Sequence, residues 1–249
     1  MTPRLLAVLV VVVGLAGVAV AGLATFAARK DRTVFTRPAP VRSVEVDVEA
    51  GRVEVVAGPA NEARVDRTRQ YIWGAPEIIE TLNDGVLRLT ARCRAFVALG
   101  CKVDYRVEVP GAVSVHVRTD RGNVEVEGMT GMVEVETEAG GVRLVGTRGP
   151  VRASTAAGDI DGADLVAGFV DATTGAGGIR LSLAEPSARV GLRTDAGNIE
   201  LALPDAPGGY RVTTETGAGR VEVTVPQEAL SSRAVTATTG AGNITIRTR

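Results

Sequence analysis

Few residues in this chain of 249 amino acids are of the types that perform chemistry. His116 is the sole histidine and is flanked by valines, so it lacks the partners that nucleophilic triads and most transition-metal sites require. The glycine clusters at residues 175–178 and 217–219 lack the lysine and the following helix of a phosphate-binding loop. The sequence therefore predicts no catalytic residue, no metal site and no cofactor, and it indicates a protein that is not an enzyme.

One group of carboxylates keeps a lesser alternative open. Asp159, Asp161 and Asp164 are close in sequence, and Asp171 lies on the next expected strand. Parallel β-helix enzymes that cleave acidic polysaccharides use clustered aspartates with Ca²⁺, a cation that prefers hard oxygen ligands. However, Asp159 occupies a turn position that holds Asn or Gly in most other repeats of the chain, and Asp161 belongs to a charge pattern. Both observations favour structural roles over catalysis.

The two cysteines, Cys93 and Cys101, are eight residues apart. A pair that frames so short a loop suits a disulfide in an oxidising compartment. Such a bridge stabilises the folded state by roughly 2–3 kcal/mol in the chain-entropy model. The alternative is a pair of buried free thiols in a cytosolic domain.

A sequence repeat must position these residues. The pattern Thr-x-x-Gly-x-(Val/Ile) occurs seven times between Thr119 and Ile244. Its turn glycines, separated by 18, 18, 19, 20, 22 and 23 residues, are Gly122, Gly140, Gly158, Gly177, Gly197, Gly219 and Gly242. A period near 20 residues is typical of a solenoid, in which each unit buries its apolar face against its neighbours.

Each repeat reads as a strand, a tight turn and a second strand. In residues 132–144, valines alternate with charged residues on both sides of a glycine-containing turn, as expected for strands with one buried face. We therefore expect an all-β fold: a single-chain, parallel β-helix-like solenoid of about seven repeats.

Charged residues support the same stacking. After the first buried Val or Ile, successive repeats carry Glu125, Arg143, Asp161, Arg180, Glu200, Glu222 and Thr245. The matching residues of the preceding strand are expected to be Glu134, Arg152, Asp171, Gly191, Arg211 and Thr236. The signs largely alternate, which favours in-register parallel strands, because opposite charges side by side contribute roughly 0.2–1 kcal/mol each.

The N-terminal part divides into three predicted segments. Residues 5–26 are uncharged and apolar, so residues 1–28 are interpreted as a transmembrane anchor, with a cleavable signal sequence as the alternative. Residues 29–40 are expected to be a linker. Residues 41–110 are expected to form a degenerate first repeat and an irregular β cap, with a hairpin turn at residues 83–85, and the repeats fill residues 111–249.

The composition and the C-terminal repeat indicate which binding partners to expect. With a net charge of −1 and 3% aromatic residues, the chain shows no feature of nucleic-acid binding. The last repeat ends at Ile246, three residues before the C-terminus, so its edge is expected to be uncovered. Open strand edges pair with other chains, which makes a homo-oligomer or filament possible.

The repeat also resembles a known family. The residues Tyr105-Arg-Val-Glu-Val-Pro-Gly, the stretch Arg118-Thr-Asp-Arg-Gly-Asn-Val-Glu-Val-Glu-Gly and the recurring Thr-x-x-Gly units are similar to the bacterial β-strand-repeat family labelled "putative adhesin", over roughly residues 41–249. The resemblance implies a β-solenoid on the bacterial envelope, often behind a membrane anchor, without assigned chemistry.

Together these observations favour a non-enzymatic binding, adhesion or scaffold module. It would be held in the cytoplasmic membrane by residues 5–26, with the C-terminal domain outside. Secretion after signal cleavage is the alternative location. Its ligand would be an envelope polymer or protein, and self-assembly through open ends is the alternative function.

Overall fold

The computed structural model describes residues 29–37, 40–59, 62–72, 74–93 and 100–249. This part of the chain contains strands and no helix, as the all-β prediction requires. The strands are β1 (Arg29–Arg37), β2 (Ser43–Ala50), β3 (Val53–Gly58), β4 (Ala63–Tyr71), β5 (Glu77–Asn83), β6 (Val86–Arg92), β7 (Lys102–Pro110), β8 (Ser114–Arg121), β9 (Val124–Glu127), β10 (Val133–Ala139), β11 (Val142–Val145), β12 (Val151–Ala157), β13 (Ile160–Leu165), β14 (Phe169–Ala176), β15 (Ile179–Leu183), β16 (Arg189–Ala196), β17 (Ile199–Leu203), β18 (Arg211–Ala218), β19 (Val221–Val223), β20 (Ala234–Ala241) and β21 (Ile244–Thr248).

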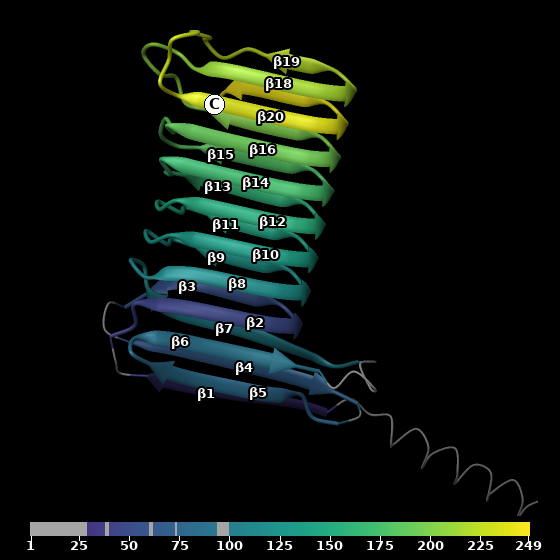
Figure 1. Cartoon of the computed structure of the whole chain (residues 1–249). Coiled ribbons are helices and arrows are strands. Elements are labelled where there is room, and N and C mark those ends of the chain that lie inside the picture. Colours follow the sequence, from purple (N-terminus) through teal and green to yellow (C-terminus); the bar gives the residue numbers. More distant parts are fainter. Residues whose placement is uncertain (1–28, 38–39, 60–61, 73, 94–99) are drawn as a thin grey trace, which may run out of the picture.

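The strands form two sheets that face each other along the whole molecule (Figure 1). Sheet A has the order β1-β4-β7-β3-β9-β11-β13-β15-β17-β21-β19, and sheet B the order β18-β20-β16-β14-β12-β10-β8-β2-β6-β5. Each predicted repeat supplies one strand to sheet B and the next to sheet A, and it pairs in parallel with the repeats above and below it. The chain is therefore a stack of two-stranded rungs, which confirms the predicted solenoid.

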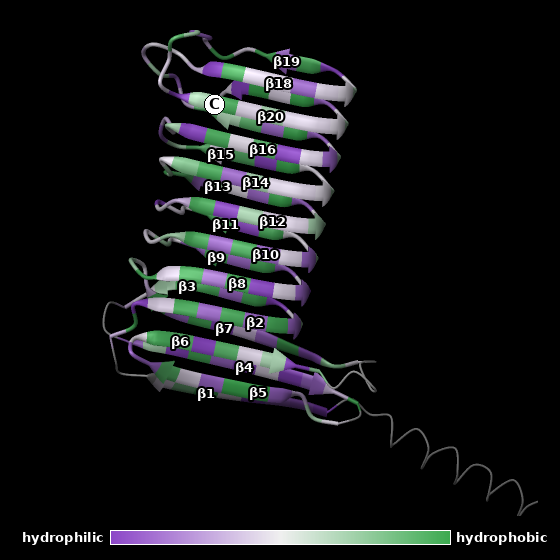
Figure 2. Ribbon diagram, in the orientation of Figure 1, coloured by the Kyte–Doolittle hydropathy of each residue, from purple (hydrophilic) through white to green (hydrophobic). Residues whose placement is uncertain are grey.

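Alternation along the strands fills the space between the sheets. In β10, Val133 and Val135 are buried while Glu134 and Glu136 face outward, and the same pattern recurs on most rungs. Figure 2 shows the result as hydrophobic and hydrophilic residues alternating along each strand. Valine dominates because a β-branched side chain packs well on a pleated, half-buried surface.

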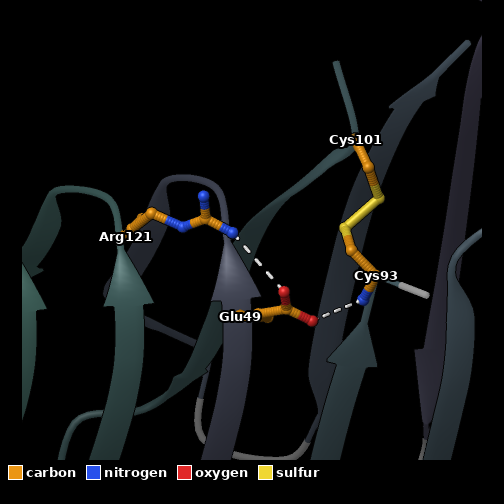
Figure 3. The surroundings of a disulfide bond; sticks show 4 residues. All are labelled: Glu49, Cys93, Cys101 and Arg121. Atoms are coloured by element: carbon orange, nitrogen blue, oxygen red, sulfur yellow. Dashed lines mark hydrogen bonds and ion pairs between the residues drawn. A yellow bond between two sulfur atoms is a disulfide. The ribbon is translucent and has the colours of Figure 1, made fainter. Parts of the chain in front are cut away.

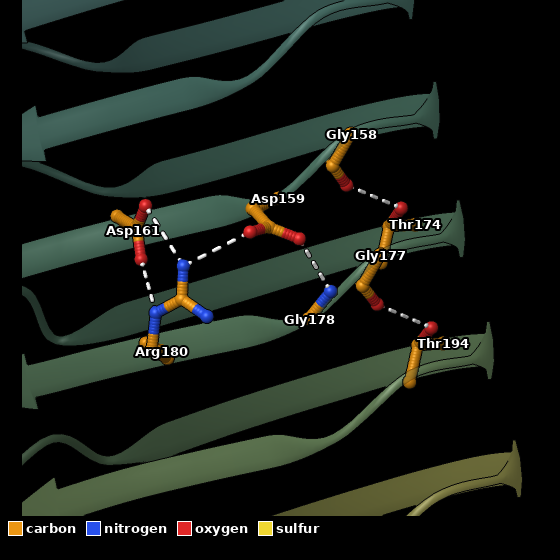
Figure 4. Close-up of polar contacts among 8 residues, drawn as sticks. All are labelled: Gly158, Asp159, Asp161, Thr174, Gly177, Gly178, Arg180 and Thr194. Atoms are coloured by element: carbon orange, nitrogen blue, oxygen red, sulfur yellow. Dashed lines mark hydrogen bonds and ion pairs between the residues drawn. The ribbon is translucent and has the colours of Figure 1, made fainter.

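The repeated threonine and glycine stack in a column at the turn of each rung. Gly158 has a φ of +155°, and a Cβ at that position would lie 2.1 Å from the carbonyl oxygen of Gly140 on the preceding rung. The buried Thr174 donates its hydroxyl hydrogen to the carbonyl oxygen of Gly158 at 2.9 Å, and Thr194 does the same to Gly177 (Figure 4). The motif therefore serves stacking: glycine permits the close approach, and threonine satisfies the carbonyl that the turn exposes.

The residue after the turn glycine forms a second polar column. The Oδ1 atom of Asn123 accepts the backbone N–H of Gly141 at 3.0 Å, and Oδ1 of Asp159 accepts that of Gly178 at 2.7 Å. Asn198 accepts from Asn243 in the same way, at 2.8 Å. An Asn or Asp on one rung thus satisfies the N–H of the next, which is the structural role predicted for Asp159.

The N-terminal region differs from the predicted linker and cap. Residues 29–37 form β1, antiparallel to β4, because its charged and threonine side chains pair with those of β4; Asp31 accepts from Arg69 at 2.6 Å. Strands β2 and β3 lie in the expected first repeat, and β6 and β7 also form a parallel rung, which lies beneath it. Within the described residues, the antiparallel pairs are β1 with β4, β4 with β7 and β5 with β6. Strand β5 joins β6 through the predicted hairpin turn, where Asp84 and Gly85 have positive φ.

The C-terminal region contains an exchange of rungs. The seventh repeat, β20 and β21, lies between the fifth and sixth, so the sixth repeat forms the end of the stack. The neutral Thr245 thereby separates Glu200 from Glu222, two like charges that sequence order would place side by side. The prediction that the last repeat is the exposed edge is therefore wrong. The register also places Thr213, not Arg211, in line with Thr236.

A part-buried polar network closes the N-terminal end of the core. Arg67 of β4 donates to Glu80 of β5 at 2.7 Å and to Thr33 at 3.0 Å, and the Tyr105 hydroxyl donates to Glu80 at 3.1 Å. Arg67 and Glu80 are only 12% and 14% exposed. Burial, followed by the charge of Glu80, raises the pKa of Tyr105 far above its usual value. This network joins the two sheets where the valine core stops.

Cys93 and Cys101 form the predicted disulfide, which connects the end of β6 to the start of β7 (Figure 3). Both residues are buried. The Cys93 N–H donates to Glu49 at 2.8 Å, and Arg121 lies 3.4 Å from the other oxygen of Glu49. The bridge thus occupies the place where the other rungs have their glycine turn.

The expected anchor or signal sequence, residues 1–28, lies outside the described residues. In the part of the chain that the structure covers, no helix is long and apolar enough to cross a membrane.

Candidate functional site: a hollow on sheet A

The outward side chains of sheet A form straight columns. The first column, in spatial order from the N-terminal end, is Arg106, Glu54, Glu125, Arg143, Asp161, Arg180, Glu200, Thr245 and Glu222. Opposite charges are adjacent at most steps; for example, Arg143 lies 3.3 Å from Glu125. Parallel register fixes these positions, so the face presents a rigid pattern of charge.

The second outward column becomes small in the middle of the sheet. Ala163, Ser182 and Ala202 occupy it on β13, β15 and β17, between Val145 on one side and Arg247 on the other. Because these side chains are short, they form the floor of an open hollow of about 470 Å³. This volume is within the range of small-molecule sites, roughly 300–1,000 Å³.

Four arginines surround this floor. Arg143, Arg180, Arg247 and Arg249 line the hollow, and its carboxylates are Asp161 and Glu200. Three of these arginines are already paired: Arg143 with Glu125, Arg180 with Asp159 and Asp161, and Arg249 with Asp164. Within the described residues, the Arg247 side chain has no hydrogen bond or ion pair, so its guanidinium is available to a ligand.

A β-bulge shapes one side of the hollow. The pairing of β13 with β15 shifts between Gly162 and Leu165, and Asp164 has a φ of +55°. Bulges of this kind re-aim a side chain. Here the Asp164 carboxylate turns outward and accepts from Arg249, which is 85 residues away in the sequence. The backbone N–H of Arg249 is held by the carbonyl of Leu203 at 2.8 Å.

Arg180 is held by two carboxylates. Its Nε donates to Asp161 at 2.8 Å and its Nη2 to Asp159 at 3.0 Å (Figure 4). The backbone N–H of Gly178, followed by Arg180, lowers the pKa of Asp159 below its usual range, so this carboxyl stays ionised at neutral pH. These hydrogen bonds fix the orientation of the Arg180 guanidinium. Its Nη1 atom takes part in none of them.

The aspartates of the alternative enzyme do not converge. Asp171 lies on β14 in sheet B, while Asp161 lies on β13 in sheet A. Asp159 and Asp161 bind Arg180, and Asp164 binds Arg249. Among the described residues, no group of three or more His, Cys, Asp or Glu side chains could hold a metal ion. His116 faces outward on β8, and its Nδ1 lies 3.4 Å from Glu134.

Sequence reasoning missed the hollow itself. Ala163, Ser182 and Ala202 are unremarkable as residue types. Register pairs Ser182 with Ala202, and the bulge between β13 and β15 lies beside Ala163, so that all three line the hollow. The sequence does carry one signal. In three successive repeats, the third residue after the Ile that follows the turn is small: Ala163, Ser182 and Ala202. Arg249 could not be connected to Asp164 without the bulge and the exchanged rungs.

Comparisons with known proteins agree with this architecture. The model of the Toastrack DUF4097 family matches residues 103–249. This confirms the family resemblance stated from the repeat, although the match begins in β7 and not at residue 41.

Solved structures of two bacterial proteins are similar to this chain. The structure of a "putative cell adhesion protein" from Clostridium sporogenes is 12% identical, with 90% of this chain and 100% of that chain covered and a TM-score of 0.43. A "putative adhesin" from Bacteroides fragilis is 10% identical, with 88% and 97% covered and a TM-score of 0.47. No curated protein matches the chain.

Proposed function

We propose that this chain, which belongs to the Toastrack DUF4097 family, is a non-enzymatic binding module displayed outside the cytoplasmic membrane. Its ligand is an extended, acidic envelope polymer, which lies across sheet A. The observation that carries the proposal is the hollow over Ala163, Ser182 and Ala202 with arginines around it. Apolar residues 5–26 support anchoring, and the Cys93–Cys101 disulfide supports an oxidising location.

The charges favour sheet A over sheet B as the binding face. A hollow on sheet B is lined by one arginine, Arg118, and by the carboxylates of Asp120, Glu136 and Glu138. That hollow would repel an acidic ligand. On sheet A the arginines are spaced along the stacking direction, and arginine donates to carboxylate or phosphate oxygens through a rigid fork. An extended ligand can therefore contact several of them at once.

Filling the floor of the hollow is expected to abolish binding. In Ser182→Trp, an indole would occupy the space between Ala163 and Ala202, and we expect at least a tenfold loss of affinity for polygalacturonate, used as a model acidic polymer. Binding of the full chain in detergent would be measured by calorimetry at several salt concentrations, because ionic contacts weaken as salt screens them. The matched control is Thr173→Trp, an outward, half-buried position on β14 of sheet B.

Two outcomes would contradict this proposal. One is equal affinity in the Ser182→Trp and Thr173→Trp variants. The other is no saturable binding to polygalacturonate or to a phosphate-bearing polymer such as a teichoic acid. Cleavage of the polymer that is lost in Asp161→Ala would instead favour the polysaccharide-active alternative.

A further inference from the structure

Six charged side chains line the hollow on sheet A. Four of them take part in ion pairs: Arg143, Asp161, Arg180 and Arg249. The other two are Arg247 and Glu200, and within the described residues neither side chain has an ion pair or a hydrogen bond. Both are exposed. The hollow therefore offers a ligand one free cation and one free anion, on the neighbouring strands β21 and β17.

Glu200 is unpaired because neither neighbour in its column offers a free cation. On one side lies Arg180, whose guanidinium donates to Asp161 and Asp159 (Figure 4). On the other side lies the neutral Thr245. No cation of the sheet neutralises this carboxylate, so it is available to an ammonium group of a ligand.

Arg247 is unpaired for a similar reason. Its neighbour in register is Ala202, and Ser182 follows on the next strand, so these strands place no carboxylate beside it in its column. From strand spacing and rise, the Cα atoms of Arg247 and Glu200 are roughly 8 Å apart, at diagonal positions. The two side chains form no ion pair with each other, so each can bind a different group of one ligand.

The exchange of rungs gives the hollow this pair of charges. Strands β19 and β21 share one register, in which Glu222 lies beside Thr245. Stacking in chain order would instead put β19 against β17. Glu222 would then lie beside Glu200, and Thr224 would take the place of Arg247. The exchange thus removes a second carboxylate and adds a guanidinium, which leaves one free charge of each sign.

We propose that the hollow recognises a zwitterionic group on the polymer, in which an ammonium lies a few bonds from a phosphate or a carboxylate. The ammonium binds Glu200, and the anionic oxygens bind Arg247 through its fork of N–H donors. The short side chains of the floor leave room for the atoms that link the two charges. This inference rests on the proposed function and narrows it, because the acidic polymer must also carry amino groups.

Two forms of one polymer test the sign of this preference. A teichoic acid with ester-linked alanine carries ammonium groups near its phosphates, and mild alkaline hydrolysis removes them. Hydrolysis makes the polymer more acidic, so a hollow that attracts negative charge alone would bind the hydrolysed form more tightly. We expect the opposite. Calorimetry on the full chain in detergent should show at least about threefold tighter binding of the aminoacylated form.

Substitutions by glutamine remove each charge and keep a side chain of similar length. We expect Glu200→Gln to bind the hydrolysed form at least as tightly as the aminoacylated form. Arg247→Gln should bind both forms about threefold more weakly than the wild type. The matched controls are Glu222→Gln and Arg220→Gln, which remove exposed, unpaired charges outside the hollow. Both controls should keep the wild-type preference.

The outcomes separate this inference from the proposed function. Equal or tighter binding of the hydrolysed form by the wild type, or a preference that survives Glu200→Gln, overturns recognition of a zwitterion and leaves the acidic polymer in place. A loss of preference in Glu222→Gln as large as that in Glu200→Gln also overturns it, because the effect would then come from the overall charge of the sheet. Saturable binding of neither form overturns both proposals.

Discussion

Replacing Gly158 with alanine is expected to destabilise the protein by about 3–5 kcal/mol, a large fraction of the stability of an ordinary domain. Gly158 has a φ of +155°, and the new Cβ would lie 2.1 Å from the Gly140 carbonyl oxygen and 2.5 Å from its carbon. The backbone of one rung would have to move away from the other. That movement would also lengthen the 2.9 Å hydrogen bond from Thr174 to the Gly158 carbonyl.

Substitutions at two other glycines separate the steric clash from the backbone strain as causes of this loss of stability. Gly146 has a φ of +59° but open space around its Cβ, so Gly146→Ala should cost only about 1–2 kcal/mol, from backbone strain. Gly168 has open space and no positive φ, so Gly168→Ala should change the free energy of unfolding by less than about 0.5 kcal/mol. Urea unfolding followed by circular dichroism would rank the three variants. A Gly158→Ala variant as stable as Gly168→Ala would show that the glycine column does not limit rung spacing.

Replacing Arg67 with methionine should cost about 3 kcal/mol, the lower end for a buried ion pair, because it leaves the part-buried Glu80 carboxylate without its cation. Arg67 and Glu80 are 12% and 14% exposed, and Glu80 would retain only the Tyr105 hydroxyl among the contacts that now stabilise its charge. The exposed pair Arg88–Glu45, 58% and 39% exposed, is the matched control. Arg88→Met should cost at most about 1 kcal/mol.

The double variant Arg67→Met with Glu80→Met tests the cause of this loss. Removing both charges abolishes the uncompensated carboxylate, although the Tyr105 hydroxyl then loses its acceptor. We therefore expect the double variant to be more stable than Arg67→Met alone in the same urea titration. The double variant could instead lose as much unfolding free energy as Arg67→Met and Glu80→Met lose together. In that case the polar network does not act as a unit, and the cap is held by other contacts.

Much of the fold follows from the sequence because the repeat acts locally. Alternating valines specify strands, and Gly158 and its equivalents specify turns that each rung makes with its neighbours alone. The Cys93–Cys101 bridge was also predictable, since two cysteines around a short loop allow one pairing. The family match extends over the residues where this local pattern is regular.

Features that depend on the order of stacking were not predictable in the same way. The exchange of the sixth and seventh repeats leaves each strand unchanged and alters only which rungs are neighbours. Its trace in the sequence is the like sign of Glu200 and Glu222, which consecutive stacking would place in contact. Similarly, β6 and β7 lie beneath β2 and β3 although they follow them in the chain. The small residues that form the floor of the hollow recur at one place in the repeat, but the hollow itself also depends on a bulge and on long-range register, which the repeat does not encode.

Display of the solenoid outside the cytoplasmic membrane is tested most directly by labelling intact cells at one introduced cysteine. Thr236 is exposed on sheet B, and both native cysteines are bonded to each other, so Thr236→Cys would carry the single free thiol of the described residues. We predict that a membrane-impermeant maleimide labels this variant in intact cells and leaves the wild type unlabelled. Labelling that appears only after lysis would place the solenoid in the cytoplasm and contradict binding of an envelope polymer.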